Sequence, residues 1–263
     1  MRRATSQSHA LVILKITVDS NERRLLHYLS SIKAPSNHTI PLIDVIDLGI
    51  EKSIIVLPWK SPLDEVLRFR DRPDDVVPLC LQFIEGVAFL HQHNVAHCDL
   101  KPENVVVDTK SESKGSPRLF IIDFDLAMYV ESEETMTEGW CGTPPWIAPE
   151  LGSISEPTRR YSPILADRWV CGKMIEYFAR YFPTHEGARK TRLRAFARRL
   201  LGLNPRARPK LNELQAIHGP RKRKAAKSQH ESVPKRHAVN WCVQILLYSS
   251  GLTDRSMRAP GRS

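Results

Sequence analysis

The sequence contains little of what secreted, disulfide-linked or membrane-spanning proteins require. Its 263 residues include only five cysteines, an odd number without closely paired spacing, so no disulfide framework is expected. The basic N-terminus precedes only a short apolar run, which Lys15 interrupts, so no signal peptide is indicated. No segment approaches the roughly 18 consecutive apolar residues of a membrane-spanning helix. We therefore expect an intracellular protein, in the nucleus or the cytoplasm, without a membrane partner.

Positive charge, by contrast, is abundant, and the formal net charge at pH 7 is +10. Much of it lies in residues 192–210 and 221–237. The first segment has the pattern of an amphipathic helix with a basic solvent-facing side, so nucleic acid is not expected as a partner. The second segment is expected to be an exposed tail. Its form, RKRKAAK followed by PKRH, is that of a two-part signal for a nuclear import receptor, with a solvated charged tail as the alternative.

Apolar patterning in the first third of the chain predicts a small α/β unit. Residues 11–16 and 54–57 are rich in β-branched side chains and are typical of buried strands. Between them, residues 20–32 place apolar side chains on one face of a predicted helix that Ser20 would cap. Residues 38–47 are a weaker strand candidate, because Pro41 removes a hydrogen-bond donor.

The pattern then changes to helical spacing from residue 76 to residue 90. Two short strands are predicted at residues 105–107 and 119–122, and a long loop at 129–145. Further helices are predicted over residues 164–180, 189–201 and 211–217. The expected organisation is a small lobe at residues 1–60, a larger mainly helical lobe at 61–218, and a basic tail at 219–263.

Two motifs in the larger lobe carry residue types that phosphate transfer requires. Residues 97–104 read HCDLKPEN, and residues 120–127 read FIIDFDLA. The first resembles the H-x-D-L-x-x-x-N catalytic loop of eukaryotic protein kinases, and the second resembles their D-F-G segment. The resemblance implies an α+β, bilobal protein-kinase-like fold with a truncated small β-rich lobe, and a Ser/Thr protein kinase that uses ATP and Mg²⁺ on a protein substrate.

Residue roles follow from this resemblance. Asp99 would be the catalytic base for the substrate hydroxyl, and Lys101 would place positive charge near the transferred phosphoryl group. Asn104 and Asp123 would bind magnesium and, through it, the nucleotide. The two predicted strands between the motifs would form a hairpin that brings Asn104 and Asp123 together.

Further motifs follow in the order that the kinase family has. GTPPWIAPE, residues 142–150, resembles the end of an activation segment. In the resembling family, Glu150 would pair with Arg208, and Asp167 would hold the catalytic-loop backbone. In the small lobe, VILK resembles V-A-I-K, so Lys15 would contact the nucleotide phosphates and Glu22 would be its ion-pair partner. The short spacing of these two residues and the sequence DFDLA also resemble a fungal group of divergent kinases.

The sequence departs from the kinase pattern at four points. No G-x-G-x-x-G motif precedes Lys15, Asp125 replaces the glycine of D-F-G, and Cys98 replaces the arginine of H-R-D. The interval between Gly172 and Arg208 is also short. Weak activity is therefore expected, with a catalytically impaired pseudokinase that acts as a binding scaffold as the alternative. A nucleic-acid-binding protein acting through its tail is a third class, which predicts a steep salt dependence.

Two other readings of reactive side chains are weaker. The closely spaced His91, His93 and His97 could suggest zinc, but no cysteine or carboxylate completes a convincing ligand set. Cys98 adjoins the predicted catalytic aspartate and could be sensitive to oxidation, although a neutral packing role is favoured.

Overall fold

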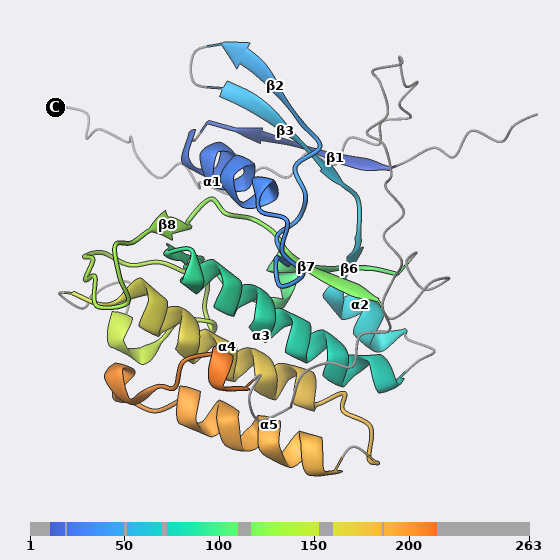
Figure 1. Cartoon of the computed structure of the whole chain (residues 1–263), viewed down its shortest axis with the longest axis vertical. Coiled ribbons are helices and arrows are strands. Elements are labelled where there is room, and N and C mark those ends of the chain that lie inside the picture. The colour runs from blue at the N-terminus through green and yellow to red at the C-terminus, as the bar shows by residue number, and fades with distance from the viewer. Residues whose placement is uncertain are drawn as a thin grey trace, which may run out of the picture.

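The protein folds into two stacked lobes, as Figure 1 shows in a computed structural model. The structure describes residues 11–18, 20–49, 52–69, 73–109, 117–152, 160–185 and 187–214. The basic tail, including the import-signal motif, lies outside these residues. The expected bilobal α+β architecture is confirmed. None of the helices in the described ranges is long and apolar enough to cross a membrane.

The small lobe is an antiparallel sheet with one helix. Strands β1 (Val12–Thr17), β2 (Asp44–Gly49) and β3 (Lys52–Pro58) lie in the order β1-β3-β2. Helix α1 (Ser20–Ser31) contributes Leu26 and Leu29 to the same buried cluster as Ile55 of β3. The predicted strands and helix are confirmed, and β2 begins only after Pro41.

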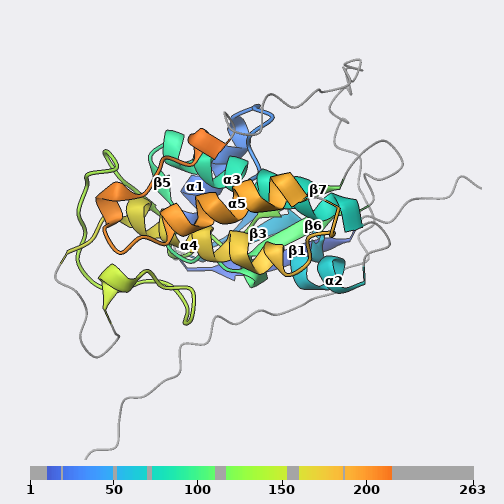
Figure 2. The same cartoon turned by 90° about the horizontal axis from the view of Figure 1, so that it is seen from below.

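The large lobe is built on long helices, which confirms three of the predicted ones. Helix α3 (Val76–Gln92) is buried along most of its length, because its apolar residues recur at helical spacing. Helices α4 (Pro163–Ala179) and α5 (Gly187–Leu200) lie side by side (Figure 2). The Oγ of Ser162 accepts a hydrogen bond from the backbone N–H of Leu165, so Ser162 is the N-cap of α4.

One helix was not predicted, namely α2 (Leu63–Arg68). It has only six residues and begins directly after Pro62. It forms because Leu63 and Leu67, one turn apart, both bury their side chains in the core.

A short hairpin lies between the two sequence motifs. Strand β6 (Val105–Asp108) pairs with β7 (Arg118–Ile121), and β4 (Ser61–Pro62) lies beside β6. The two predicted strands are thus confirmed. Part of the expected loop at 129–145 is wrong, because Tyr129 belongs to β8 (Met128–Tyr129), which pairs with β5 (Val95–Ala96).

Candidate functional site

The predicted catalytic loop follows β5 and is anchored by a residue of helix α4. The backbone N–H groups of His97 and Cys98 donate hydrogen bonds to the Asp167 carboxylate, at 2.7 and 3.0 Å. Asp167 is buried, so these charge-assisted bonds are shielded from water. The expectation that Asp167 holds the catalytic-loop backbone is confirmed. Cys98 is held with a φ of 64°, a conformation that is uncommon for a side chain with a Cβ.

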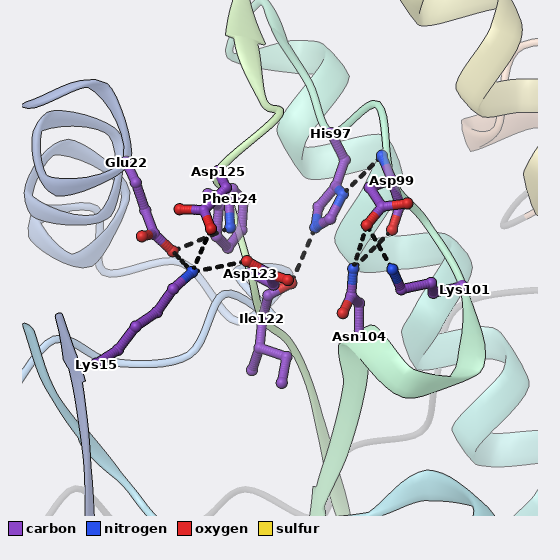
Figure 3. A network of polar contacts seen from close by, with 10 residues as sticks. All are labelled: Lys15, Glu22, His97, Asp99, Lys101, Asn104, Ile122, Asp123, Phe124 and Asp125. Carbon is purple, nitrogen blue, oxygen red and sulfur yellow. Dashed lines mark hydrogen bonds and ion pairs between the residues drawn. The ribbon is translucent and has the colours of Figure 1, made fainter. Parts of the chain in front are cut away.

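The Asp99 carboxylate lies at the centre of a compact polar network (Figure 3). Lys101 Nζ is 2.7 Å from Asp99 Oδ2, and Asn104 Nδ2 donates to the same oxygen at 3.1 Å. Thr143 Oγ1 donates to Asp99 Oδ1 at 2.8 Å and accepts from Lys101 Nζ at 2.8 Å. These bonds fix the orientation of a carboxylate that is only 8% exposed. The structure therefore brings Asp99, Lys101 and Asn104 together.

Thr143 is a member of this network that the sequence prediction missed. It lies 44 positions after Asp99, in the loop that ends at the APE-like motif. The sequence GTPP was recognised as part of that motif, but nothing local assigned its threonine a partner. Its contact with Asp99 depends on how the loop folds back over the catalytic loop.

A neutral histidine connects the two motifs. His97 is fully buried, and burial lowers its pKa despite the opposing charge of Asp167. Its Nε2–H donates to the carbonyl oxygen of Ile122 at 3.0 Å, while Nδ1 accepts from the Asp99 N–H at 3.3 Å. The ring also contacts the Phe124 ring, with 5.0 Å between centroids. His97 thus has a structural role. Among the described residues, the group of side chains that could hold a metal ion consists of carboxylates and does not include His97.

The hairpin brings the two predicted magnesium-binding positions together. The Ile122 N–H donates to the Asn104 carbonyl oxygen at 3.0 Å, so the chain enters Asp123 beside Asn104. Asp123 has a φ of 66°, which turns the chain out of the strand direction. The Asn104 amide nitrogen is bonded to Asp99, and its amide oxygen is therefore the atom suited to a metal.

Lys15 forms the centre of the small-lobe half of the site (Figure 3). Its Nζ lies 2.8 Å from Glu22 Oε1, 2.7 Å from Asp123 Oδ1 and 3.0 Å from Asp125 Oδ2. Lys15 comes from strand β1, Glu22 comes from helix α1, and both aspartates come from the segment after β7. The contact with Asp125 was not predicted, because that residue had been considered as a replacement of glycine that adds a charge beside the metal site.

Charges in this cluster depend strongly on one another. Burial opposes protonation of Lys15, but the charges of Glu22 and Asp123 prevail and raise its pKa. For Glu22, burial and then a hydrogen bond with Asp125 raise the pKa to about 7, against the opposing charge of Lys15. Burial would raise the pKa of Asp125, but its hydrogen bonds and the Lys15 charge lower it. Glu22 therefore binds a proton at a higher pH than an ordinary glutamate does, with Asp125 as its hydrogen-bond partner.

The donor atoms of this region fit a magnesium ion, which prefers hard oxygen ligands. The Asp123 carboxylate and the Asn104 amide oxygen supply two such donors. Glu22, Asp123 and Asp125 also each offer a carboxylate oxygen within 4.8 Å of one another. The residues present could therefore hold the cation that a nucleotide substrate would bring.

The segment that ends at the APE-like motif is anchored by a buried ion pair. Arg208 NH2 is 2.7 Å from Glu150 Oε2, and its other nitrogens donate to the carbonyl oxygens of Leu165 and Gly202. The Arg208 side chain is completely buried. This confirms the expected Glu150–Arg208 pair and fixes the end of the segment to the large lobe.

Comparison with known proteins gives a consistent result. A family model described as "Protein kinase domain" matches residues 26–216. The phosphorylase b kinase gamma catalytic chain, liver/testis isoform, of Bos taurus is 29% identical over 191 residues, which are 66% of this chain and 45% of that protein. CBL-interacting serine/threonine-protein kinase 8 of Arabidopsis thaliana is 37% identical over 106 residues, 40% of this chain and 22% of that one.

A third relative, serine/threonine-protein kinase 17A of Oryctolagus cuniculus, is 39% identical over 100 residues, 37% of this chain and 22% of that protein. The matched part of this chain thus spans less than half the length of each of these three relatives. Lys15 and Glu22 lie ahead of the range that the family model matches.

Proposed function

The chain belongs to the protein kinase domain family, and on that premise we propose that it transfers the γ-phosphate of ATP to a hydroxyl group of a protein. The relatives reported above are named as kinases, and two of them as serine/threonine kinases, which supports the Ser/Thr type. We infer ATP and Mg²⁺ as the substrate and the cofactor from the same membership.

The observation that carries this proposal is the convergence of five side chains between the lobes (Figure 3). Lys15 comes from the small lobe, and the other four come from the two large-lobe motifs. The five residues are Lys15, Asp99, Lys101, Asn104 and Asp123. Phosphate transfer depends mainly on positioning and on neutralising charge, and this set supplies cations, a carboxylate base and metal ligands within one region.

Asp99 would act as the base for the substrate hydroxyl. Its carboxylate is held by Thr143 and Asn104, so it can accept a proton without reorienting. General-base catalysis of this kind contributes about 10²–10⁴-fold in rate. Lys101, in contact with both Asp99 and Thr143, would stabilise negative charge on the phosphoryl group that approaches the base.

Lys15 would contact the nucleotide phosphates, oriented by Glu22 from helix α1. The Glu22 carboxylate also accepts the Phe124 N–H at 3.2 Å, so the helix is tied to the segment that carries Asp123. Asn104 and Asp123 would hold magnesium, which neutralises phosphate charge when bound. The two lysines and Asp99 then orient the reacting groups.

One feature suggests that transfer is weak. Asp125 adds a carboxylate 3.0 Å from the lysine that the phosphates require. DFDLA and the close Lys15–Glu22 spacing make a divergent fungal kinase group the proposed subfamily.

A scaffold pseudokinase is the second candidate function. It is favoured by the three carboxylates that already engage Lys15, because nucleotide phosphates would have to compete with them. In that case the fold would bind partner proteins without turnover.

We further propose an intracellular location and, from the tail motif, a nuclear import receptor as partner. Both rest on the sequence alone, and nucleic acid is not proposed as a partner.

A radiolabelled phosphate-transfer assay with Mg²⁺-ATP and a general protein substrate tests the proposed function. The wild-type chain is expected to transfer phosphate slowly, and Asp99→Asn is expected to lose about 10²–10⁴-fold of that rate. The matched control is Asp47→Asn, which is the same substitution at an exposed residue of β2. The Asp47 carboxylate accepts a hydrogen bond from the Gly49 N–H.

Fusion of a β-hairpin that carries G-x-G-x-x-G ahead of Leu11 sharpens this test. Among the described strands, β1 is at the edge of the small-lobe sheet, so an added hairpin has a strand to pair with. The fusion is expected to raise the transfer rate. If neither chain transfers phosphate while both bind a partner protein, the scaffold function replaces the kinase function.

A further inference from the structure

Two cysteines from different segments lie near Asp99, the proposed base. Cys98 lies in the catalytic loop, is 7% exposed, and packs in a small apolar cluster with Val130 and Ile164. Cys141 lies in the loop before the APE-like motif and packs against the same cluster. The two thiols are within hydrogen-bonding reach of each other. The two side chains are therefore in contact, although 43 positions separate them.

The backbone independently shows how closely the two segments approach. A Cβ atom added to Gly142 would lie 3.4 Å from the carbonyl oxygen of Cys98. Gly142 has a φ of 97°, a conformation that favours glycine, so the chain can pass the catalytic loop at this distance. The proximity of the cysteines thus does not depend on the thiol hydrogen bond alone.

The surroundings of the two sulfur atoms differ. Hydrogen bonds from Cys98 and, at 3.1 Å, from the Tyr161 hydroxyl lower the pKa of Cys141, although its partial burial and the charges of Asp167 and Asp99 act against this. For Cys98, the bond to Cys141, burial and the same two aspartates raise the pKa. Cys141 is therefore the more reactive thiol and is only partly buried, whereas Cys98 is shielded.

We propose that Cys98 and Cys141 form a reversible disulfide on exposure to hydrogen peroxide, and that this bond switches the phosphate-transfer site. The part that concerns phosphate transfer rests on the proposed function. The other described cysteines, Cys80 and Cys171, are completely buried, and burial raises the pKa of each thiol. They therefore do not compete for the oxidant.

The reaction balances in two steps. The Cys141 thiolate attacks one oxygen of hydrogen peroxide, the O–O bond breaks, and the products are a sulfenic acid and, after protonation of the leaving hydroxide, water. The Cys98 sulfur then attacks the Cys141 sulfur, the S–O bond breaks, and a second water leaves with the Cys98 proton. In total, two thiols are oxidised by two electrons and one peroxide is reduced to two waters. A dithiol such as dithiothreitol reverses the bond by thiol–disulfide exchange.

The bond would alter the site because both cysteines adjoin its polar network. Cys98 directly precedes Asp99, and Cys141 lies two residues before Thr143, which donates to Asp99. An S–S bond is about 2.05 Å long, much shorter than a thiol hydrogen bond, so forming it draws the two side chains closer together. We expect this change to shift the Thr143 hydroxyl and Asp99 from their present alignment. Oxidation is expected to lower phosphate transfer by tenfold or more, and dithiothreitol is expected to restore it.

The test treats the full chain with increasing hydrogen peroxide and maps disulfide-linked peptides by mass spectrometry. Cys242 lies outside the described residues and is replaced by serine in every variant. A linked pair containing Cys98 and Cys141 is expected in this background and in the matched control Cys80→Ala. It is expected to be absent in Cys98→Ser and Cys141→Ser. Any other linked pair, or none over the range in which Cys141 is oxidised, overturns the proposal.

A second measurement tests the basis of the reactivity. The rate at which iodoacetamide alkylates Cys141 rises with pH. The midpoint of this rise is expected below a pH of about 8.5, the value for a free thiol. Tyr161→Phe removes one hydrogen-bond donor and is expected to shift this midpoint upward and to slow disulfide formation. A midpoint at or above that of a free thiol contradicts the assignment of Cys141 as the attacking thiol.

The failure of this proposal and that of the proposed function can be told apart. Peptide mapping reports the disulfide whether or not the chain transfers phosphate. If the reduced chain shows no transfer, the effect of the bond is measured as a change in magnesium-dependent ATP binding, which is expected to be lost on oxidation and regained on reduction. A disulfide that leaves both transfer and nucleotide binding unchanged overturns the switch.

Discussion

The two halves of the candidate site are built differently. In the large lobe, Asp99 is almost completely buried, and its two carboxylate oxygens are engaged by Lys101, Asn104 and Thr143. In the small lobe, Lys15 faces three carboxylates, two of which, those of Asp123 and Asp125, are about one-third exposed. The first half pairs each charge within a fixed network, whereas the second half has an excess of negative charge.

This difference predicts which substitutions will change the stability of the protein and which will change nucleotide binding. Buried, fully paired networks lose much stability when one member is removed, because the remaining group stays desolvated. Water weakens the interactions of partly exposed charges, so removing one such charge changes stability only modestly. We therefore expect substitutions in the large lobe to affect stability, and substitutions around Lys15 to affect mainly nucleotide binding.

The largest effect on stability is expected from Glu150→Gln. It removes the charge that compensates the buried Arg208, and the cost is expected to be about 3–5 kcal/mol of unfolding free energy. Urea denaturation measures this value. The matched control is Glu213→Gln, whose ion pair with Arg199 is roughly half exposed and should contribute less than about 1 kcal/mol. Equal losses in the two variants would contradict the contrast between buried and exposed pairs.

The next effect concerns the metal site. Asp123→Asn removes a negative charge from the expected magnesium ligand and should abolish the magnesium-dependent part of ATP binding, with the fold retained. A thermal-shift titration with ATP, with and without Mg²⁺, measures it, and Asp47→Asn serves as the control on β2. Magnesium dependence that persists unchanged in Asp123→Asn would count against Asp123 as a ligand.

A smaller effect, in the opposite direction, is expected from Asp125→Gly. The change removes a carboxylate that competes for Lys15 and repels phosphate. A charge pair about 4 Å apart in bulk water is worth about 1 kcal/mol, and Asp125 is partly exposed, so ATP affinity should rise at least several-fold in a calorimetric titration. Glu213→Gln gives the same change in net charge away from the site. Weaker binding would instead identify Asp125 as a third carboxylate that the cation requires.

The smallest effect is expected from negative charge on the activation loop. Thr135→Glu and Thr137→Glu should change phosphate transfer by less than tenfold, about 1.4 kcal/mol in barrier. Cys98 offers no cation to such a charge, and Arg168 is already paired with Glu133 in the same loop. A rise of tenfold or more in either variant would show that the loop responds to phosphorylation despite the missing arginine.

Local patterns were sufficient to predict most of the fold. Apolar spacing predicted β1, β3, α1 and the long helices of the large lobe, because a helix or strand of ordinary length buries one face. The ordered motifs indicated the family, which the match over residues 26–216 supports. Helix α2 was missed, since its six residues are too few for a periodic signal and Pro62 marks its start.

The same patterns were insufficient for several partners of the site residues. Asp125 was read as an added charge beside a metal, but its contact with Lys15 requires β1 to lie against the segment after β7. Thr143 and Cys141 had no assigned partner, because the loop that carries them has no periodicity. No rule of spacing connects them to the catalytic loop more than 40 positions earlier.

The sequence by itself determined the elements, the order of the motifs and the chemical types available for phosphate transfer, since propensity, periodicity and turn residues act over a few positions. Only the tertiary structure decided which groups meet. Lys15 contacts Asp123 across 108 positions, and Cys98 contacts Cys141 because Gly142 lets two backbones approach. Such contacts arise when the lobes and loops pack, and their charges and pKa values follow from that packing.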